Sequence, residues 1–148
     1  MSSIFKAMDI SSSGLAAQRV RMNILSSNLA NAQTTKSAEN GGGPYRRQDV
    51  VFTANPVGEA FENYLDEDFG TQMQEVKVTE IHKDTKEPRM VFDPTHPHAD
   101  KDGMVAMPNI QVMTEMVNMI AATRAYEANV TAMNNAKAMA MKALEIGR

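Results

Sequence analysis

The sequence predicts an α+β protein in which two long terminal helices pack as an antiparallel coiled-coil-like pair, with a small β-containing region between them. Three observations predict this fold: an apolar stripe with alternating steps of four and three near each end of the chain, and short β-branched runs in the middle. The 148 residues are enough for one domain. We expect an N-terminal helix over 1–35, a linker and small β-rich outer region over 36–108, and a C-terminal helix over 109–148.

The N-terminal segment carries a heptad seam in which Ser11 and Gln18 are the polar members. Its apolar members are Ile4, Met8, Leu15, Met22, Leu25, Leu29 and Ala32. A glycine inside a helix costs about 0.5–1 kcal/mol relative to alanine, so we interpret Gly14 as a place of close approach to another helix. We expect Asn28 and Asn31, three residues apart, either to fix the register between helices or to form a fraying C-terminal turn.

The middle of the chain begins with a linker over residues 36–44, KSAENGGGP, which cannot continue a helix. Three short runs bounded by turn residues then predict the strands of one small sheet: DVVF at 49–52, EVKVTEI at 75–81 and RMVF at 89–92. Segment 60–70 is ambiguous between a short helical turn and a loop. The β-rich region is therefore small, and we expect it to lie outside the helix pair.

Segment 93–103 holds two histidines and three aspartates, which makes a metal site conceivable. Pro94 and Pro97 favour an extended backbone, however, and Asp102-Gly103 is a common turn pair. We therefore interpret the segment as a surface turn and predict no metal, no cofactor and no catalytic residues. We also expect His82, in a strand-like run, to be an exposed polar position.

The C-terminal helix is predicted to start after Pro108 with Asn109 as its N-cap, because no Gly or Pro interrupts the residues from Ile110 to Ile146. At 1.5 Å per residue this helix is about 55 Å long. Its seam consists of Val112, Met116, Met119, Thr123, Tyr126, Val130, Met133, Lys137, Ala140 and Leu144, and a second stripe of Ala121, Ala125, Ala128, Ala132 and Ala136 lies beside it. One partner helix cannot cover both stripes, so several neighbours are expected.

Composition excludes several classes of function. The net charge is −3 and the basic residues are scattered, which argues against a nucleic-acid-binding protein. The chain has no cysteine, which excludes disulfides and cysteine nucleophiles. Residues 1–20 contain no apolar run typical of a cleaved secretory signal, and no run is long enough to span a membrane.

Burial of the apolar seam in the first helix returns less free energy than the ordering of that helix costs in conformational entropy. Burial among several neighbouring subunits would complete this seam. We therefore predict that both termini are poorly ordered in the free monomer and fold on assembly. Strong amide-exchange protection throughout residues 5–30 of dilute protein would contradict this prediction.

Short motifs follow one another in order from end to end of the chain. They are Ser13-Gly14-Leu15, Gln18-Arg19, Arg21-Met22-Asn23, 28–32 with Thr34, 44–52, 93–109, Val112, Glu115-Met116, Met119-Ile120, 124–129 and Ala143-Leu144. Together they resemble the signatures of the axial proteins of the bacterial flagellum, most closely a protein of the proximal rod. The resemblance implies a structural, non-enzymatic subunit whose terminal helices line the rod and which assembles helically.

The same resemblance implies where the protein works and with what. The partners would be copies of itself, other rod proteins and the junction between the rod and the membrane ring. Export would use the flagellum-specific type III apparatus without a cleaved signal, and the rod would lie in the periplasm. We expect the assembly interface to comprise Ile4, Met8, Gly14, Leu15, Met22, Leu25, Asn28, Leu29, Asn31, Val112, Met116, Met119, Tyr126, Val130, Met133 and Leu144.

Two other classes of function remain open from the residues. A cytoplasmic helical adapter would bind one partner through the seam at 112–144. A metal-binding module or metal-dependent enzyme would use His96 and His98 with nearby aspartates. Recovery of the protein in purified flagellar basal bodies would separate the rod interpretation from both.

Overall fold

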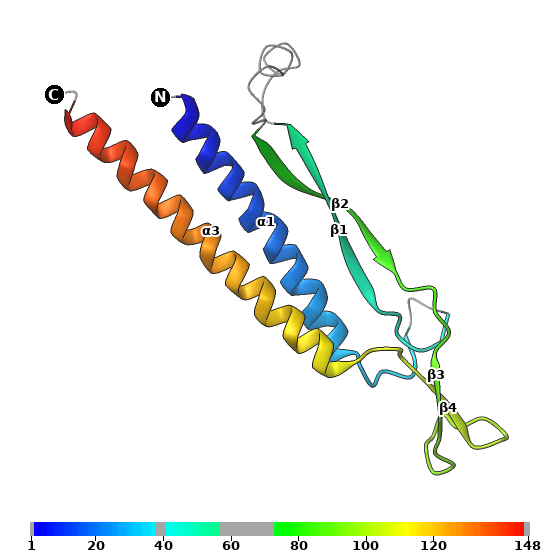
Figure 1. The fold of residues 1–148 in the computed structure, drawn as a ribbon. Coiled ribbons are helices and arrows are strands. Elements are labelled where there is room, and N and C mark those ends of the chain that lie inside the picture. The colour runs from blue at the N-terminus through cyan, green and yellow to red at the C-terminus, as the bar shows by residue number, and fades with distance from the viewer. Residues whose placement is uncertain (1, 38–40, 57–72, 147–148) are drawn as a thin grey trace. The chain divides into compact units, whose positions relative to one another are not determined.

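The computed structural model describes residues 2–37, 41–56 and 73–146, with the backbone alone for residues 2–4. The element order is α1 (Ser2–Ala30), β1 (Gln48–Pro56), β2 (Gln74–Lys83), β3 (Arg89–Phe92), β4 (Met104–Met107) and α3 (Val112–Ile146) (Figure 1). The chain divides into two compact units. Unit 1 comprises Met1–Val20, Val51–Glu80 and Ala122–Arg148, and unit 2 comprises Arg21–Val50 and Ile81–Ala121.

The α+β layout is confirmed. Each unit contains a part of α1 beside a part of α3, with opposite chain directions (Figure 1).

Serine hydroxyls inside α1 bond to carbonyl groups about one turn back, Ser11 to Ala7 at 3.0 Å and Ser13 to Ile10 at 2.8 Å. These bonds satisfy the hydroxyls without breaking the helix. In unit 1 the Val76 N–H donates to the Ser13 oxygen at 3.1 Å and ties β2 to α1.

The three predicted strands are confirmed, but their arrangement in one sheet is wrong. The described residues form two two-stranded sheets, β1 with β2 and β3 with β4. The sequence prediction missed β4, the antiparallel partner of β3, and so grouped β3 with the first two strands. Segment 60–70 lies outside the described residues. His82 is exposed in β2, as expected.

The predicted surface turn over 93–103 is confirmed as the connection between β3 and β4. The Asp93 N–H donates to the Gly103 carbonyl at 2.9 Å, and the Gly103 N–H donates to the Asp100 carbonyl at 2.8 Å. Gly103 has a φ of 71°, a conformation that glycine adopts without steric cost. A Cβ at Gly103 would also lie 3.0 Å from a ring carbon of Phe92. Both the turn and the packing of Phe92 therefore require glycine here.

The start of α3 differs from the prediction. The helix begins at Val112, and the Glu115 N–H bonds to the Gln111 carbonyl at 3.1 Å, so Gln111 and not Asn109 occupies the N-cap position. Pro108 is buried just before the helix. The N-cap prediction was therefore wrong by two residues, because the chain first packs Pro108 against its own unit.

The buried side chains of each unit are few. In unit 1 they are alanines, Ala17, Ala122 and Ala136. Among the described residues of unit 2 the buried apolar side chains are Leu25, Tyr45, Val105 and Pro108, joined by the polar Asn28 and Glu115. Small residues allow close approach of backbones, and the polar residues in unit 2 require hydrogen-bond partners.

Candidate assembly interface

A buried polar network in unit 2 joins α1, the start of β1 and α3. Its centre is Asn28, which is 0% exposed. The Asn28 Nδ2 donates to the Gln48 carbonyl at 2.7 Å and to Glu115 Oε2 at 3.0 Å. Its Oδ1 accepts from the Gln48 N–H at 2.9 Å and the Tyr45 hydroxyl at 3.1 Å. A primary amide has two N–H donors and an oxygen with two lone pairs, so all four positions are used.

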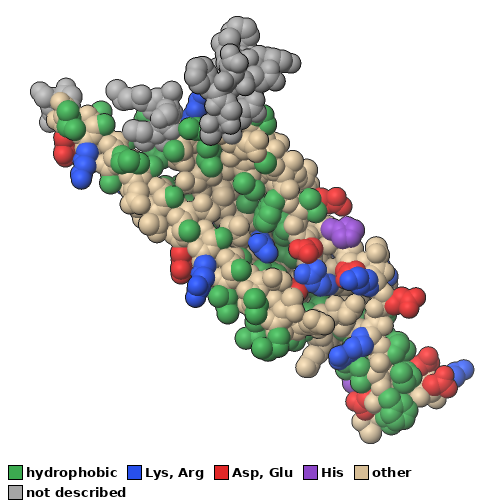
Figure 2. Space-filling view, viewed as in Figure 1, with side chains coloured by type: hydrophobic (Ala, Val, Ile, Leu, Met, Phe, Trp, Pro, Cys, Tyr) green, Lys and Arg blue, Asp and Glu red, His purple; other side chains and the backbone are tan. Residues whose placement is uncertain are grey.

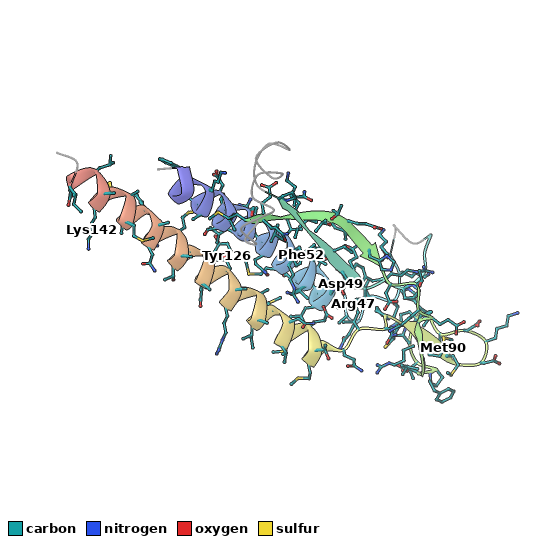
Figure 3. All side chains as sticks on the ribbon, turned by 45° about the horizontal axis from the view of Figure 1, so that its top comes forward. Arg47, Asp49, Phe52, Met90, Tyr126 and Lys142 are labelled. Carbon is teal, nitrogen blue, oxygen red and sulfur yellow. The ribbon has the colours of Figure 1, made fainter. Side chains whose placement is uncertain are left out.

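Glu115 is a buried carboxylate, 1% exposed, whose charge is paired. Arg47 donates from Nε to its Oε1 at 2.8 Å and from Nη1 to Asp49 Oδ2 at 3.1 Å (Figure 3). Burial alone would lower the pKa of Arg47, but the hydrogen bonds and charges of Glu115 and Asp49 raise it overall. An unpaired buried carboxylate would be strongly unfavourable. With both oxygens bonded and a permanently charged partner, Glu115 is accommodated inside the unit.

Asn31, the second asparagine singled out in the sequence, follows the last residue of α1 and makes its side-chain hydrogen bonds within the end of the helix and the turn after it. Its Nδ2 donates to the Ser27 carbonyl at 2.9 Å, and its Oδ1 accepts from the Thr34 hydroxyl at 3.1 Å. Each of the two interpretations therefore holds for one of the two asparagines. Asn28 links α1 to α3, as a register-fixing residue would, and Asn31 belongs to the terminal turn.

In unit 1 Gly14 of α1 lies close to Asn129 of α3. A Cβ built on Gly14 would lie 3.0 Å from Asn129 Nδ2, closer than side-chain carbons normally come. This contact confirms the interpretation of Gly14 as a point of close approach. It also places Asn129 in the contact with α1.

The buried side of α3 follows a different seam from the predicted stripe. The buried and half-buried residues that repeat at steps of four and three are Glu115, Met119, Ala122, Tyr126, Asn129, Met133, Ala136 and Ala140. Four of them belong to the predicted stripe, but Val112, Met116, Thr123, Lys137 and Leu144 of that stripe are exposed. The four seam residues outside the predicted stripe are two alanines and two polar residues. The prediction missed them because it followed the larger side chains.

An uncovered apolar surface, called here the α3 patch, lies at the start of α3 in unit 2. It consists of Val112, Met113, Met116, Val117 and Ile120, whose exposed fractions run from 41% to 72%. Figure 2 shows a group of green hydrophobic side chains there. The one charged residue of this stretch, Glu115, is buried. A contiguous uncharged apolar surface of this kind is typical of a protein–protein contact.

A second uncovered apolar surface, called here the hairpin face, lies on the β3–β4 hairpin. The antiparallel register pairs Met90 with Ala106 and Phe92 with Met104, and alternation places these four side chains on one face. Met90, which is labelled in Figure 3, is 51% exposed, and Phe92 is 68% exposed. On the opposite face Val105 is 1% exposed. The hairpin therefore turns one face into its unit and leaves the other uncovered.

Unit 1 also carries exposed large apolar side chains, near both chain ends. They are Phe5, Met139, Met141, Leu144 and Ile146. Within the described residues of this unit no other segment covers them. They are further candidates for contacts with neighbouring subunits.

The sixteen residues predicted for the assembly interface fall into three groups. Leu25 and Asn28 are buried inside the chain, and Val112, Met116 and Leu144 are exposed. The half-buried group is Met8, Gly14, Leu15, Met22, Leu29, Asn31, Met119, Tyr126, Val130 and Met133, while the side chain of Ile4 lies outside the described residues. The intrachain contacts use the buried group and, at Gly14 and along the seam of α3, members of the half-buried group, so the exposed group offers the free surface.

Tyr45, Arg47 and Glu115 were not predicted from the sequence to share a common site. Glu115 is separated from Asn28 by 87 residues and from Arg47 by 68. One signal was present, because Glu115 is the only charge in the apolar run from Ile110 to Thr123. A single acidic residue in such a run predicts that its carboxylate has a polar partner.

The histidines of the β3–β4 turn contact each other and, at His98, the Thr35 side chain that follows α1. The rings of His96 and His98 lie edge to face with centroids 5.4 Å apart, and His98 Nδ1 is 2.8 Å from the Thr35 hydroxyl. Hydrogen bonds from the hydroxyl and N–H of Thr95 lower the pKa of Asp93.

Across residues 2–37, 41–56 and 73–146 no three His, Cys, Asp or Glu side chains are grouped as a metal site would require. Over the same ranges neither helix has the length and apolar content needed to cross a membrane.

Comparison with known proteins places both chain ends in one class. The family model described as "Flagella basal body rod protein" matches residues 8–36, within α1 and the turn after it. The model described as "Flagellar basal body rod FlgEFG protein C-terminal" matches residues 101–146, from the hairpin through α3. The two segments that supply the helix pair are thus those of flagellar basal-body rod proteins.

Curated relatives extend the similarity over nearly the whole chain. The flagellar basal-body rod protein FlgC of Bacillus subtilis (strain 168) is 45% identical over 97% of this chain and 98% of its own length. FlgC of Borreliella burgdorferi is 41% identical over 97% of both chains, and FlgC of Aquifex aeolicus is 43% identical over 93% of this chain and 92% of its own. The chain belongs to the FlgC family of flagellar basal-body rod proteins.

Proposed function

We propose that this chain is a structural subunit of the flagellar basal-body rod, and specifically of its proximal part. The observation that carries the proposal is the similarity to FlgC proteins over nearly the full length of the chain, at up to 45% identity among the relatives named above. The fold agrees with a structural role, because its central features are a paired-helix seam and uncovered apolar surfaces. The same family membership supports a non-enzymatic role.

We further propose that the subunit assembles helically through its terminal helices. The α3 patch, including the predicted Val112 and Met116, and the exposed Leu144 supply apolar surface that a neighbouring subunit would cover. The partners proposed are copies of this chain, other rod proteins and the junction between the rod and the membrane ring. Leu25 and Asn28 would support this interface indirectly, by holding α1 against its own chain.

The route and place of assembly are also proposals, and family membership supports them. The subunit would pass through the flagellum-specific type III export apparatus, without cleavage of a signal peptide, and join a rod within the periplasm. The alternatives differ in where the protein is found. A helical adapter would stay in the cytosolic fraction, and a module that binds metal through His96 and His98 would take up Zn²⁺ in calorimetry.

The experiment that tests the proposal is fractionation of flagellated cells that express the chain in place of their own copy. We expect the protein in purified basal bodies. The variant Val117→Asp puts a charge on a side chain that is 62% exposed, so it should fold normally but be lost from basal bodies together with motility. Thr85→Asp adds the same charge at an exposed residue outside both apolar surfaces and should remain incorporated. Wild-type protein confined to the cytosol would refute the rod assignment.

A further inference from the structure

Both uncovered apolar surfaces of unit 2 lack a partner among the described residues of their own unit. The α3 patch and the hairpin face belong to the same unit, yet Val117 remains 62% and Phe92 68% exposed. The hairpin therefore does not cover the α3 patch of its own chain. Two separate apolar surfaces on one small unit are costly to leave in water, and each needs a partner from outside.

The two surfaces are complementary in chemistry. Neither contains a charged side chain: the α3 patch is Val, Ile and Met, and the hairpin face is Met90, Phe92, Met104 and Ala106. An aromatic ring flanked by methionines packs readily onto a methionine-rich helix surface, because methionine side chains adapt to irregular shapes. The ring of Phe92 lies beside Gly103, because a Cβ built on Gly103 would come 3.0 Å from one of its ring carbons.

The charges around the two surfaces are also complementary. The turn that adjoins Phe92 carries Asp93, Asp100 and Asp102 against Lys101, a net charge of −2 by three acids and one base. The α3 patch begins at the N-terminus of α3, where unpaired backbone N–H groups and the helix dipole are positive. From Asn109 to Ala121 no exposed side chain is acidic, since Glu115 is buried. An acidic turn can therefore approach this helix end without repulsion.

We infer that the hairpin face of one copy docks on the α3 patch of the next copy, an inference that rests on the proposed rod function and names the partner of its interface. Phe92 and Met90 would lie over Met113, Met116 and Val117, with the acidic turn beside the first turn of α3. The contact joins two different surfaces. Repetition of such a contact produces a ring or an open helix, and the second of these is the geometry of a rod.

Cysteine cross-linking tests the contact, because the chain has no cysteine of its own. Phe92→Cys and Val117→Cys are introduced into one chain, which replaces the cell's own copy, and basal bodies are oxidised. We expect a ladder of dimers, trimers and larger species in denaturing gels without reductant. Each single variant should give none, and a chain with Thr85→Cys and Val117→Cys should also give none.

Several outcomes would overturn the inference. They are the absence of a ladder, a dimer from Phe92→Cys alone, a cross-link inside one chain, or a product whose mass shows a different rod protein. These outcomes are separable from failure of the proposed function, because the amount of protein in basal bodies is measured on the same samples. Protein present in basal bodies without a ladder removes the docking contact and leaves the rod assignment intact.

Discussion

Replacement of Asn28 by alanine should lower the free energy of unfolding by about 3 kcal/mol. The side chain makes four hydrogen bonds, to Gln48 N and O, Tyr45 and Glu115, and all four partners would lose one. At about 1 kcal/mol of net stabilisation per bond, the loss is about 4 kcal/mol. Alanine favours a helix over asparagine by about 0.6 kcal/mol, which offsets a small part of it.

The measurement is urea unfolding of the purified chain, followed by circular dichroism and extrapolated to water. The matched control is Asn23→Ala, an exposed asparagine on the same helix, which should change stability by less than about 0.6 kcal/mol and in the favourable direction. A cost below about 1 kcal/mol for Asn28→Ala, or equal effects of the two variants, would refute the account of the network. A changed slope m would show instead that the unfolding unit had changed.

Three further predictions follow from single contacts. Gly14→Ala should raise the free energy of unfolding by less than the roughly 1 kcal/mol expected for this change in a helix, because the new Cβ would lie 3.0 Å from Asn129 Nδ2. In an Asn129→Ala background the same substitution should raise it by the full amount in unfolding experiments. Val105→Ala should cost about 2 kcal/mol in the same assay, because the side chain is 1% exposed. Local desolvation and then the charge of Lys36 lower the pKa of His98 from 6.5, so NMR titration should show a low value that Lys36→Gln raises. Because the folded chain binds this proton more weakly than the unfolded chain, the His98 contribution makes stability fall as pH decreases through the region of 6.5.

The helices and three strands were predictable because their signals are local. Heptad spacing and the absence of Gly and Pro mark α1 and α3, and β-branched runs mark β1, β2 and β3. β4 was missed because its sequence, MVAM, has a single β-branched residue and reads equally well as a loop or part of a helix. The division into two sheets was missed for the same reason, since β3 needs β4 as its partner.

The polar network was not predictable in detail, because it depends on segments far apart in the sequence. Asn28 was recognised as a poor helix-interior residue that could fix register. Its partners Tyr45 and Gln48 follow a glycine-rich linker whose length alone does not place them. Glu115 could have been flagged as a lone acid in an apolar run, but only the fold shows that Arg47 neutralises it. The exposed α3 patch was anticipated in part, because Val112 and Met116 belong to the assembly interface expected from the sequence.

The network also bears on the prediction that the chain ends order only on assembly. The end of α1 from Leu25 to Ala30 has its own intrachain support, because Leu25 and Asn28 are buried and Asn28 is bonded on every side. No residue from Phe5 to Ile10 is buried, and Phe5 is 58% exposed. Dependence on neighbours should therefore be greatest before Gly14, and amide exchange in the free monomer should be fast there and slower after Leu25. A helix with buried residues at one end and none at the other can join an assembly by packing its remaining turns against the next subunit.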